Sequence, residues 1–271
     1  MPQIEVNGHE LYFERHGSGE PLLLIQGMTG NHLHWGDPFR SRIEPHFDTI
    51  IYDNRGIGRS APVTDPFTVA DLADDAAALL DVLDVERAHV MGISMGGMAA
   101  QELAVGHPER VRTLVLGCTT AGGPDATPPE PVVLETLGQL FMAGRVGEAF
   151  REGFKFNVSP EFAADPANVE TFRKIAEELP MDMPILFAQF QAVQGHDTST
   201  RLGDIDAPAL IIHGSADRIL PVANAHNLAR LMPEARLEIF DGVGHLFWWE
   251  RPERAAELVR EHARAGAAAA Q

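Results

Sequence analysis

The sequence has few of the features that would link it to nucleic acid, to a membrane or to an oxidising compartment. It contains a single cysteine, Cys118, so no disulfide can form within the chain, and a reducing cytoplasm is the expected location. It contains only two lysines and no Lys/Arg run, and 21 basic against 39 acidic residues give a formal charge of -18. We therefore expect no nucleic-acid partner and no membrane partner, since both would require clustered cations.

Long hydrophobic runs are also missing. The first residues lack the basic and apolar segments of a signal peptide, and the longest early apolar run, residues 22–25, is far too short to span a bilayer. Hydrophobic residues make up 45% of the 271 residues and charged residues 22%, which is ordinary globular composition. A chain of this length can form one large domain with a full core.

Short β-branched or Leu-rich runs alternate along the chain with amphipathic segments of helical period. The expected strands are residues 4–6, 11–16, 22–26, 49–54, 88–93, 111–118, 209–213 and 235–240. The expected helices are residues 68–83, with Thr68 as N-cap, and residues 95–107, 222–231 and 252–265. The buried runs are continuously apolar, as central parallel strands are. The pattern predicts an α/β fold with a mostly parallel eight-stranded sheet and helices on both faces.

The stretch 122–203 interrupts this alternation, because helical patterns follow one another there without a strand between them. Gly and Pro residues mark its start, and Gly195 with a polar run marks its end. We therefore expect a core of residues 1–121 and 204–271 and an inserted helical cap, or lid, of residues 122–203. Eight of the chain's 14 phenylalanines lie in the cap. They either pack a small helical subdomain or, collectively, line an apolar substrate pocket.

One short motif carries the predicted chemistry. Gly92-Ile93-Ser94-Met95-Gly96 follows an apolar run directly and precedes a helical pattern. A sharp strand-to-helix turn at Ser94 would lift its hydroxyl above the ends of the strands, and the glycines would give the turn room. The same turn would aim the amide of Met95 at an oxygen bonded near Ser94. Ser94 is therefore the predicted nucleophile, and Met95 is a predicted oxyanion donor.

A serine nucleophile needs a general base and an acid that orients the base. His245 follows the last predicted strand, and Asp217 follows the strand before it. Both are therefore expected at the same end of the sheet as Ser94. The order Ser94, Asp217, His245 along the chain is a known triad order. Other carboxylates near these strands are expected to be solvated turn residues.

With these three residues in this order, the sequence resembles the α/β-hydrolase superfamily over nearly its whole length. The resemblance also rests on the loop Asp53-Asn54-Arg55-Gly56-Ile57-Gly58-Arg59-Ser60, on His107-Pro108-Glu109-Arg110-Val111 and on residues 244–252. Within the superfamily the chain is most similar to small bacterial serine esterases and lactonases with a helical cap, including the aclacinomycin methylesterase and enol-lactone hydrolase types.

The resemblance also implies a second oxyanion donor in the loop after the third strand. Gln26-Gly27-Met28 stands there in place of the usual His-Gly-x. Met28 would give its backbone amide, and Gln26 would tie the loop down by hydrogen bonds. The residues expected to line the substrate pocket are Gln26, His32, Trp35, Phe141, Phe187, Phe190 and Leu246.

We expect no metal and no cofactor. His32 and His34 have no third ligand at a metal spacing, and no phosphate-binding glycine motif follows a strand. Asp53 and Arg55 are expected to have a structural role, holding the turn beside the nucleophile.

These features predict a cofactor-free serine hydrolase that cleaves a carboxylic ester of small to medium apolar substrates through an acyl-enzyme. The expected partner is a small-molecule ester or lactone, and a homodimer stays open. A lactonase, a carbon-carbon bond hydrolase, a perhydrolase and an acyl transferase use the same triad and also stay open. The non-enzymatic alternative is a ligand receptor on the hydrolase fold.

Overall fold

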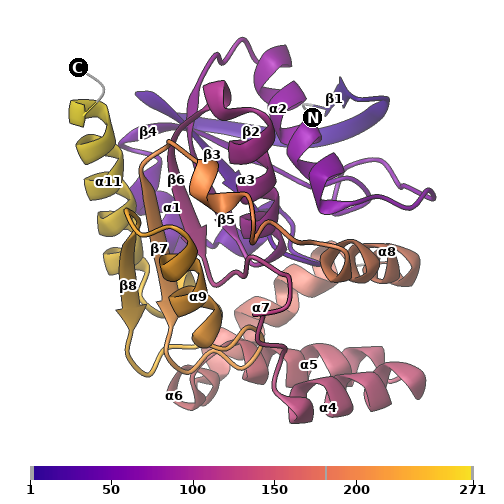
Figure 1. Ribbon diagram of the computed structural model, residues 1–271. Coiled ribbons are helices and arrows are strands. Elements are labelled where there is room, and N and C mark those ends of the chain that lie inside the picture. The colour runs from indigo at the N-terminus through magenta and orange to yellow at the C-terminus, as the bar shows by residue number, and fades with distance from the viewer. Residues whose placement is uncertain (1–2, 181, 270–271) are drawn as a thin grey trace.

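The computed structural model describes residues 3–180 and 182–269. Its centre is one eight-stranded sheet in the order β1-β2-β4-β3-β5-β6-β7-β8, seen in Figure 1. The strands are β1 Gln3–Val6, β2 His9–Gly17, β3 Glu20–Ile25, β4 Phe47–Tyr52, β5 Ala88–Ile93, β6 Val111–Gly117, β7 Ala209–Gly214 and β8 Arg236–Phe240. Strand β2 pairs antiparallel with β1 and β4, and the other pairs are parallel. The predicted mostly parallel eight-stranded sheet is confirmed.

Helices cover both faces of this sheet. One face carries α2 Val69–Val82, α3 Met95–Gly106 and α9 Ala223–Leu231, and the other carries α1 Asp37–Ile43, α10 Phe247–Glu250 and α11 Pro252–Ala269. The short helices α1 and α10 are absent from the sequence prediction, because seven and four residues show little helical period. Over the described residues, no helix combines the length and the hydropathy that crossing a membrane requires.

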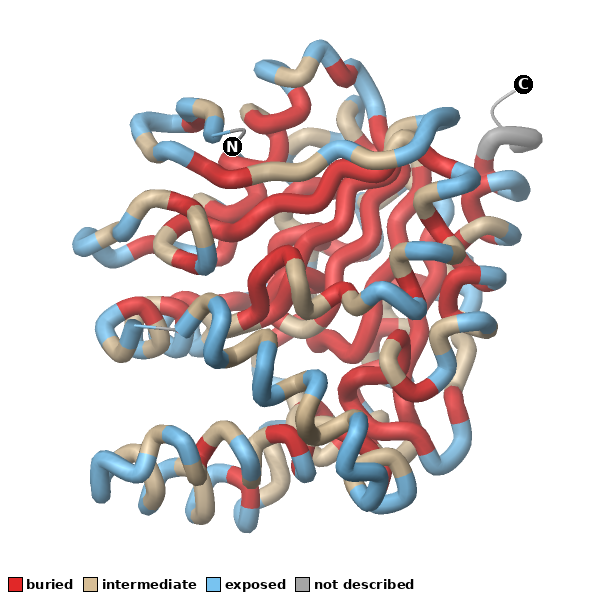
Figure 2. The backbone as a smooth tube through the Cα atoms, turned by 180° about the vertical axis from the view of Figure 1, so that it is seen from behind, coloured by how far each residue is buried: buried red, intermediate tan, exposed pale blue. Residues whose placement is uncertain are grey.

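The continuously apolar strands bury side chains in two separate cores. Leu23 and Ile25 of β3 join the core beneath α2 and α3, whereas Leu22 and Leu24 join the core beneath α1 and α11. All four side chains are fully buried. Because side chains alternate across a strand, a sheet covered on both faces has no polar side along its central strands. Figure 2 shows this buried centre surrounded by helices with exposed outer surfaces.

The start of α2 illustrates how a local signal fixes an element boundary. Thr68 Oγ1 accepts a hydrogen bond from the Asp71 amide at 3.2 Å, and the Asp71 carboxylate accepts one from the Thr68 amide at 2.7 Å. This reciprocal capping box satisfies backbone donors that the first turn of a helix leaves free. The predicted N-cap at Thr68 is confirmed.

Five helices lie between β6 and β7, and the described part of this stretch contains no named strand. They are α4 Pro131–Met142, α5 Val146–Asn157, α6 Pro160–Ala163, α7 Pro166–Glu178 and α8 Met183–Gln194. The stretch leaves and rejoins the sheet at one place, where Gly122 bridges Asp197 and the Thr198 amide donates to the Ala121 carbonyl at 2.8 Å. In Figure 1 these helices lie together below and beside the sheet. We keep the name cap for residues 122–203, and this division of the chain stays a prediction.

Gly92 offers a test of how tightly β5 and α3 pack. A Cβ atom at Gly92 would lie 2.1 Å from the Gly96 carbonyl oxygen, whereas one at Gly106, at the far end of α3, would meet nothing within 4 Å. We expect Gly92→Ala to lower the free energy of unfolding by roughly 1–3 kcal/mol, since backbone must move. Gly106→Ala should leave it unchanged or raise it by up to about 1 kcal/mol. Urea denaturation of both variants measures this, and equal effects would contradict the packing described.

Candidate active site

Ser94 lies at the turn between β5 and α3. Its backbone has φ 53° and ψ -122°, in the region that L-residues rarely adopt. Two hydrogen bonds hold it there: the Ser94 amide donates to the Gly117 carbonyl at 2.9 Å, and Thr119 Oγ1 donates to the Ser94 carbonyl at 2.7 Å. The turn predicted around Ser94 is therefore strained and fixed from β6, the neighbouring strand.

The loops after β7 and β8 bring an imidazole and a carboxylate together. His245 Nδ1 lies 2.7 Å from Asp217 Oδ2, and both side chains are buried. The other carboxylate oxygen, Oδ1, accepts hydrogen bonds from the amides of Ile219 and Leu220, each at 2.9 Å. Burial alone would raise the pKa of Asp217, but the charge of His245 and hydrogen bonds from two imidazoles lower it to about 2. Asp217 is thus held as a carboxylate that orients His245.

The second imidazole belongs to His213, which the sequence analysis did not single out. His213 Nε2 lies 2.7 Å from the Leu220 carbonyl oxygen and 3.1 Å from Asp217 Oδ2. Both neighbours can only accept, so Nε2 carries the proton and Nδ1 has none in the neutral ring. The side chain is fully buried. The only signal in the sequence was its place at the end of β7, four residues before Asp217.

The loop that carries His245 is tied to the cap. Glu250 Oε1 accepts hydrogen bonds from the Gly244 amide at 2.8 Å and from the Ser159 amide at 3.0 Å. The Leu246 amide donates to the Asn157 carbonyl at 2.8 Å. The end of α5 therefore lies directly against His245, and the cap and the catalytic end of the sheet share hydrogen bonds.

The loop after β3 lies beside Ser94 because β3 and β5 pair in parallel, with Ile25 opposite Gly92. A Cβ atom at Gly27 would lie 2.9 Å from Ser94 Cβ, so only glycine fits this approach. Among the described residues, neither the Met28 amide nor the Met95 amide donates to a protein group. Two backbone donors next to Ser94 are therefore free.

Side chains on both sides hold this loop. Gln26 Oε1 accepts from the Gly27 amide at 3.2 Å, and Asn54 Nδ2 donates to the Gln26 carbonyl at 3.1 Å. From the cap, Gln189 Oε1 of α8 accepts from the Thr29 amide at 2.8 Å. Thr29 has φ 64°, a costly conformation for a β-branched residue. The hydrogen bond that Thr29 donates to Gln189 therefore helps to hold the loop in this conformation.

Ser94 and His245 open on one cavity of about 270 Å³ between the sheet and the cap. Of the residues predicted to line the pocket, Gln26, Phe141, Phe190 and Leu246 do so, as does Met28. Five of the eight cap phenylalanines lie in its wall: Phe141, Phe150, Phe154, Phe172 and Phe190. None of the described residues in the wall is Asp, Glu, Lys or Arg. The cavity is thus lined mainly by apolar and aromatic side chains.

The expectation for His32, Trp35 and Phe187 needs correction, because none of them lines this cavity. His32 is fully buried, and its Nδ1 lies 2.9 Å from the Asp53 carboxylate. Trp35 is fully buried in the core beneath α1, and the Phe187 side chain is 60% exposed on the outer face of α8. These residues were chosen because they lie near the loop after β3 or in the cap, and sequence position alone does not show which way a side chain points.

Two residues that were not predicted to line the cavity do so: His34, in the same turn as His32 and Trp35, and Trp249 of α10. His34 follows His32 by two residues, and a turn of 3-10 helix, η1 His32–Trp35, points the two rings in different directions. Asp53 and Arg55 are structural: Asp53 also accepts from the Arg59 amide, and Arg55 pairs with Asp75 of α2 at 2.7 Å. They hold the loop after β4, whose Asn54 donates in turn to the Gln26 carbonyl in the loop beside Ser94.

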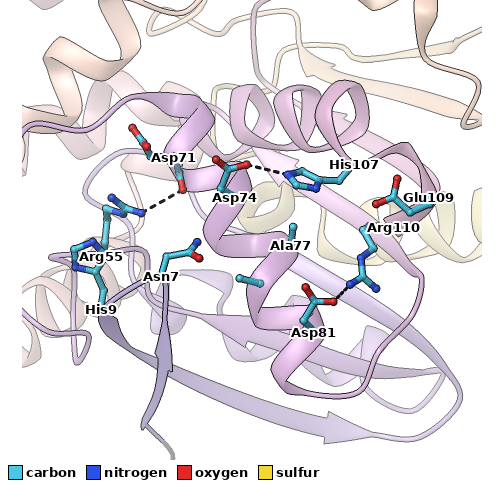
Figure 3. Close-up of a pocket in the computed structure, with 11 residues that line it drawn as sticks. Asn7, His9, Arg55, Asp71, Asp74, Ala77, Asp81, His107, Glu109 and Arg110 are labelled. Carbon is cyan, nitrogen blue, oxygen red and sulfur yellow. Dashed lines mark hydrogen bonds and ion pairs between the residues drawn. The ribbon is translucent and has the colours of Figure 1, made fainter.

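A larger groove of about 660 Å³ lies elsewhere, over α2 and the end of α3 (Figure 3). It shares no lining residue with the cavity at Ser94. Its charged side chains are largely paired with one another: His107 lies 2.8 Å from Asp74, and Arg110 pairs with Asp81. In the part of the chain that the structure describes, no three His, Cys, Asp or Glu side chains form a metal-binding group. The smaller cavity is therefore the candidate active site.

The position of His213 yields a stability test. We expect His213→Leu to lower the free energy of unfolding by roughly 1–3 kcal/mol, because the buried Leu220 carbonyl would lose its donor. His213→Gln should cost less, since the glutamine amide can donate from nearly the same place as Nε2. Urea denaturation of both variants measures the difference. Equal losses of unfolding free energy would show that His213 stabilises the fold through the volume of its ring and not through its hydrogen bond.

Comparison with known proteins agrees with this fold. The sequence model of the alpha/beta hydrolase fold family matches residues 20–252. A poly(3-hydroxyalkanoate) depolymerase from Ectopseudomonas oleovorans is 32% identical over 88% of this chain and 82% of its own. A 2-hydroxy-6-oxononadienedioate/2-hydroxy-6-oxononatrienedioate hydrolase from Paraburkholderia xenovorans is 29% identical over 92% of this chain and 89% of its own.

Among solved structures, a thermophilic esterase from Thermogutta terrifontis is 27% identical, with a TM-score of 0.82 over 98% of this chain and 99% of its own. Both kinds of likeness extend through the sheet and the cap. The chain belongs to the α/β-hydrolase fold family.

Proposed function

We propose that the protein is a serine hydrolase that cleaves carboxylic esters of small to medium, uncharged and mainly apolar substrates through an acyl-enzyme. The observation that carries this proposal is the composition of one cavity. Its wall includes the strained Ser94, His245 and Met28. Asp217 pairs with His245, and the free amides are those of Met28 and of Met95, the residue after the serine. These are the nucleophile, base, orienting acid and oxyanion donors of acyl transfer.

In the proposed reaction, Ser94 Oγ attacks the substrate carbonyl carbon while His245 Nε2 takes its proton. Asp217 keeps the His245 Nδ1 proton in place and stabilises the imidazolium. The negative oxygen of the tetrahedral intermediate lies between the Met28 and Met95 amides. The proton then passes to the leaving alkoxide, and a water activated by His245 releases the acid. Ser94 and His245 make no direct hydrogen bond here, and such bonds commonly form only with substrate present.

The cavity also supports a choice among the reactions that share this triad. A dienedioate carries two carboxylates, and the described part of the wall holds no Arg or Lys to pair with them. Transfer of an unpaired charge into an apolar cavity is unfavourable. This favours uncharged esters over the substrates named for the carbon-carbon hydrolase relative. At about 270 Å³ the cavity lies just below the usual ligand-pocket range of roughly 300–1,000 Å³, which favours small to medium acyl groups.

The test is hydrolysis of p-nitrophenyl butyrate, hexanoate and octanoate by the native protein and by Ser94→Ala. We expect multiple turnover by the native protein and a loss of roughly 10⁴-fold or more in kcat in the variant, since the nucleophile is gone. Ser41→Ala, at an exposed serine of α1, is the matched control and should retain full activity.

Activity that survives Ser94→Ala would overturn the assignment of the nucleophile. A native protein that ignores these esters and yet opens a simple lactone, or needs hydrogen peroxide as acyl acceptor, would favour the corresponding alternative. Binding of an ester without turnover would favour a receptor.

Gln189 offers a second test, directed at the oxyanion donors. Gln189→Met keeps the length of the side chain but removes the acceptor of the Thr29 amide. We expect kcat to fall about 3- to 30-fold with little change in KM, because a misplaced Met28 amide stabilises the transition state less and leaves substrate binding unchanged. The expected loss is smaller than for complete removal of an oxyanion donor, which costs roughly 2.7–4 kcal/mol. Affinity for a trifluoromethyl ketone inhibitor should fall by the same factor.

Gln189→Glu, which retains an acceptor oxygen, should recover part of the rate. Gln191→Met, at an exposed position of the same helix, is the control and should behave as the native protein. A Gln189→Met variant that loses stability but keeps kcat and inhibitor affinity would leave Gln189 as a packing residue only.

A further inference from the structure

His34 has four hydrogen-bonding groups, namely its amide, its carbonyl and the ring nitrogens Nδ1 and Nε2. The first three already have hydrogen-bond partners. Its amide donates to the Asn31 carbonyl at 3.0 Å, and its carbonyl accepts from the indoles of Trp248 and Trp249 at 3.0 and 2.8 Å. Its ring nitrogen Nδ1 accepts from the Asn31 amide at 3.1 Å. Backbone and ring are therefore fixed from several directions.

These contacts determine where the ring proton is. A backbone amide can only donate, so Nδ1 must be the unprotonated nitrogen and Nε2 carries the hydrogen. Burial lowers the pKa of His34 to about 4, so the ring is neutral at ordinary pH. Within the described residues, Nε2 has no hydrogen-bond partner, yet it is not among the polar atoms sealed off from solvent. A single N–H donor is therefore left over.

This donor belongs to a ring that lines the cavity at Ser94. The ring packs edge to face against Phe172 of α7, with 5.6 Å between the ring centroids. Phe172 packs in turn against Trp249, with 6.0 Å between the centroids. Because this N–H is accessible and has no protein partner among the described residues, an acceptor atom of a bound ligand can take the place of water there. Since this donor is uncharged and the wall holds no cation among the described residues, the fitting acceptor is a neutral oxygen.

We propose that His34 is a specificity-determining residue, whose Nε2–H donates to a neutral oxygen, such as a keto, ether or hydroxyl oxygen, on the acyl chain of the substrate. This inference rests on the proposed ester hydrolysis at Ser94 and narrows it. The preferred substrates are esters whose apolar chain carries one oxygen at a set distance from the scissile carbonyl, and the plain hydrocarbon chain is the poorer substrate.

The test compares methyl octanoate with methyl 3-oxo-, 5-oxo- and 7-oxooctanoate, each measured as acid released by the native protein. The measured quantity is the ratio of kcat/KM for each oxo ester to that for methyl octanoate. His34→Phe keeps an aromatic ring and removes the donor. We expect the ratio at one chain position to be about 3- to 10-fold higher in the native protein than in His34→Phe, as for one hydrogen bond lost. Comparison with the variant cancels the differing intrinsic reactivity of the esters.

Two further variants make the result decisive. His34→Gln places an amide donor near the position of Nε2 and should restore part of the ratio, whereas a purely structural residue would show no such rescue. His226→Phe, at an exposed histidine of α9, is the matched control and should leave every rate unchanged.

The proposal is overturned if the ratios are the same in the native protein and in His34→Phe at all three positions. If Ser94-dependent hydrolysis of methyl octanoate continues in that case, the proposed function stands and only the role of His34 fails. If the native protein hydrolyses none of the four esters, both fail together.

Discussion

The close approach of β3, β5 and α3 at Ser94 is the constraint on which the rest of the structure depends. Glycine at positions 92 and 96 lets the backbones touch, since a Cβ atom at Gly96 would lie 2.2 Å from the Ile25 carbonyl oxygen. That contact forces the serine into a left-handed conformation and leaves the Met95 amide free at the start of α3. It also places Gly27 against the serine, and hence the Met28 amide beside it. One packing contact thereby sets the position of the proposed nucleophile and of both proposed oxyanion donors.

The cap does more than cover this site, because it supplies hydrogen bonds to both loops that complete it. Gln189 holds the loop after β3 through Thr29, and the end of α5 holds the His245 loop through Asn157 and Ser159. Cap and active-site geometry are thus coupled. A change in the cap that alters the cavity therefore also acts on the loops that hold His245 and Met28.

Much of the fold could be predicted from sequence, because buried parallel strands and amphipathic helices leave strong periodic signals. The eight strands, α2 and α3 were found within a few residues of their ends. The triad candidates follow from strand order, since loops at the carboxyl ends of neighbouring strands must meet. The residues of the pocket wall were harder to predict than the triad. His32 and His34 are two residues apart, and only the turn of η1 decides which ring faces the cavity. Likewise His213 could not be linked to Asp217 without the path of the loop between them.

The central claim is that Ser94 carries the acyl group between two half-reactions. The most direct measurement is to incubate the protein with p-nitrophenyl hexanoate, quench it in acid within the first turnover and locate the adduct by peptide mass spectrometry. We expect one hexanoyl group, on the peptide that contains Ser94, and none on Ser94→Ala. Turnover accompanied by an adduct on another residue, or by none at the earliest times while p-nitrophenol is released in a burst, would contradict it.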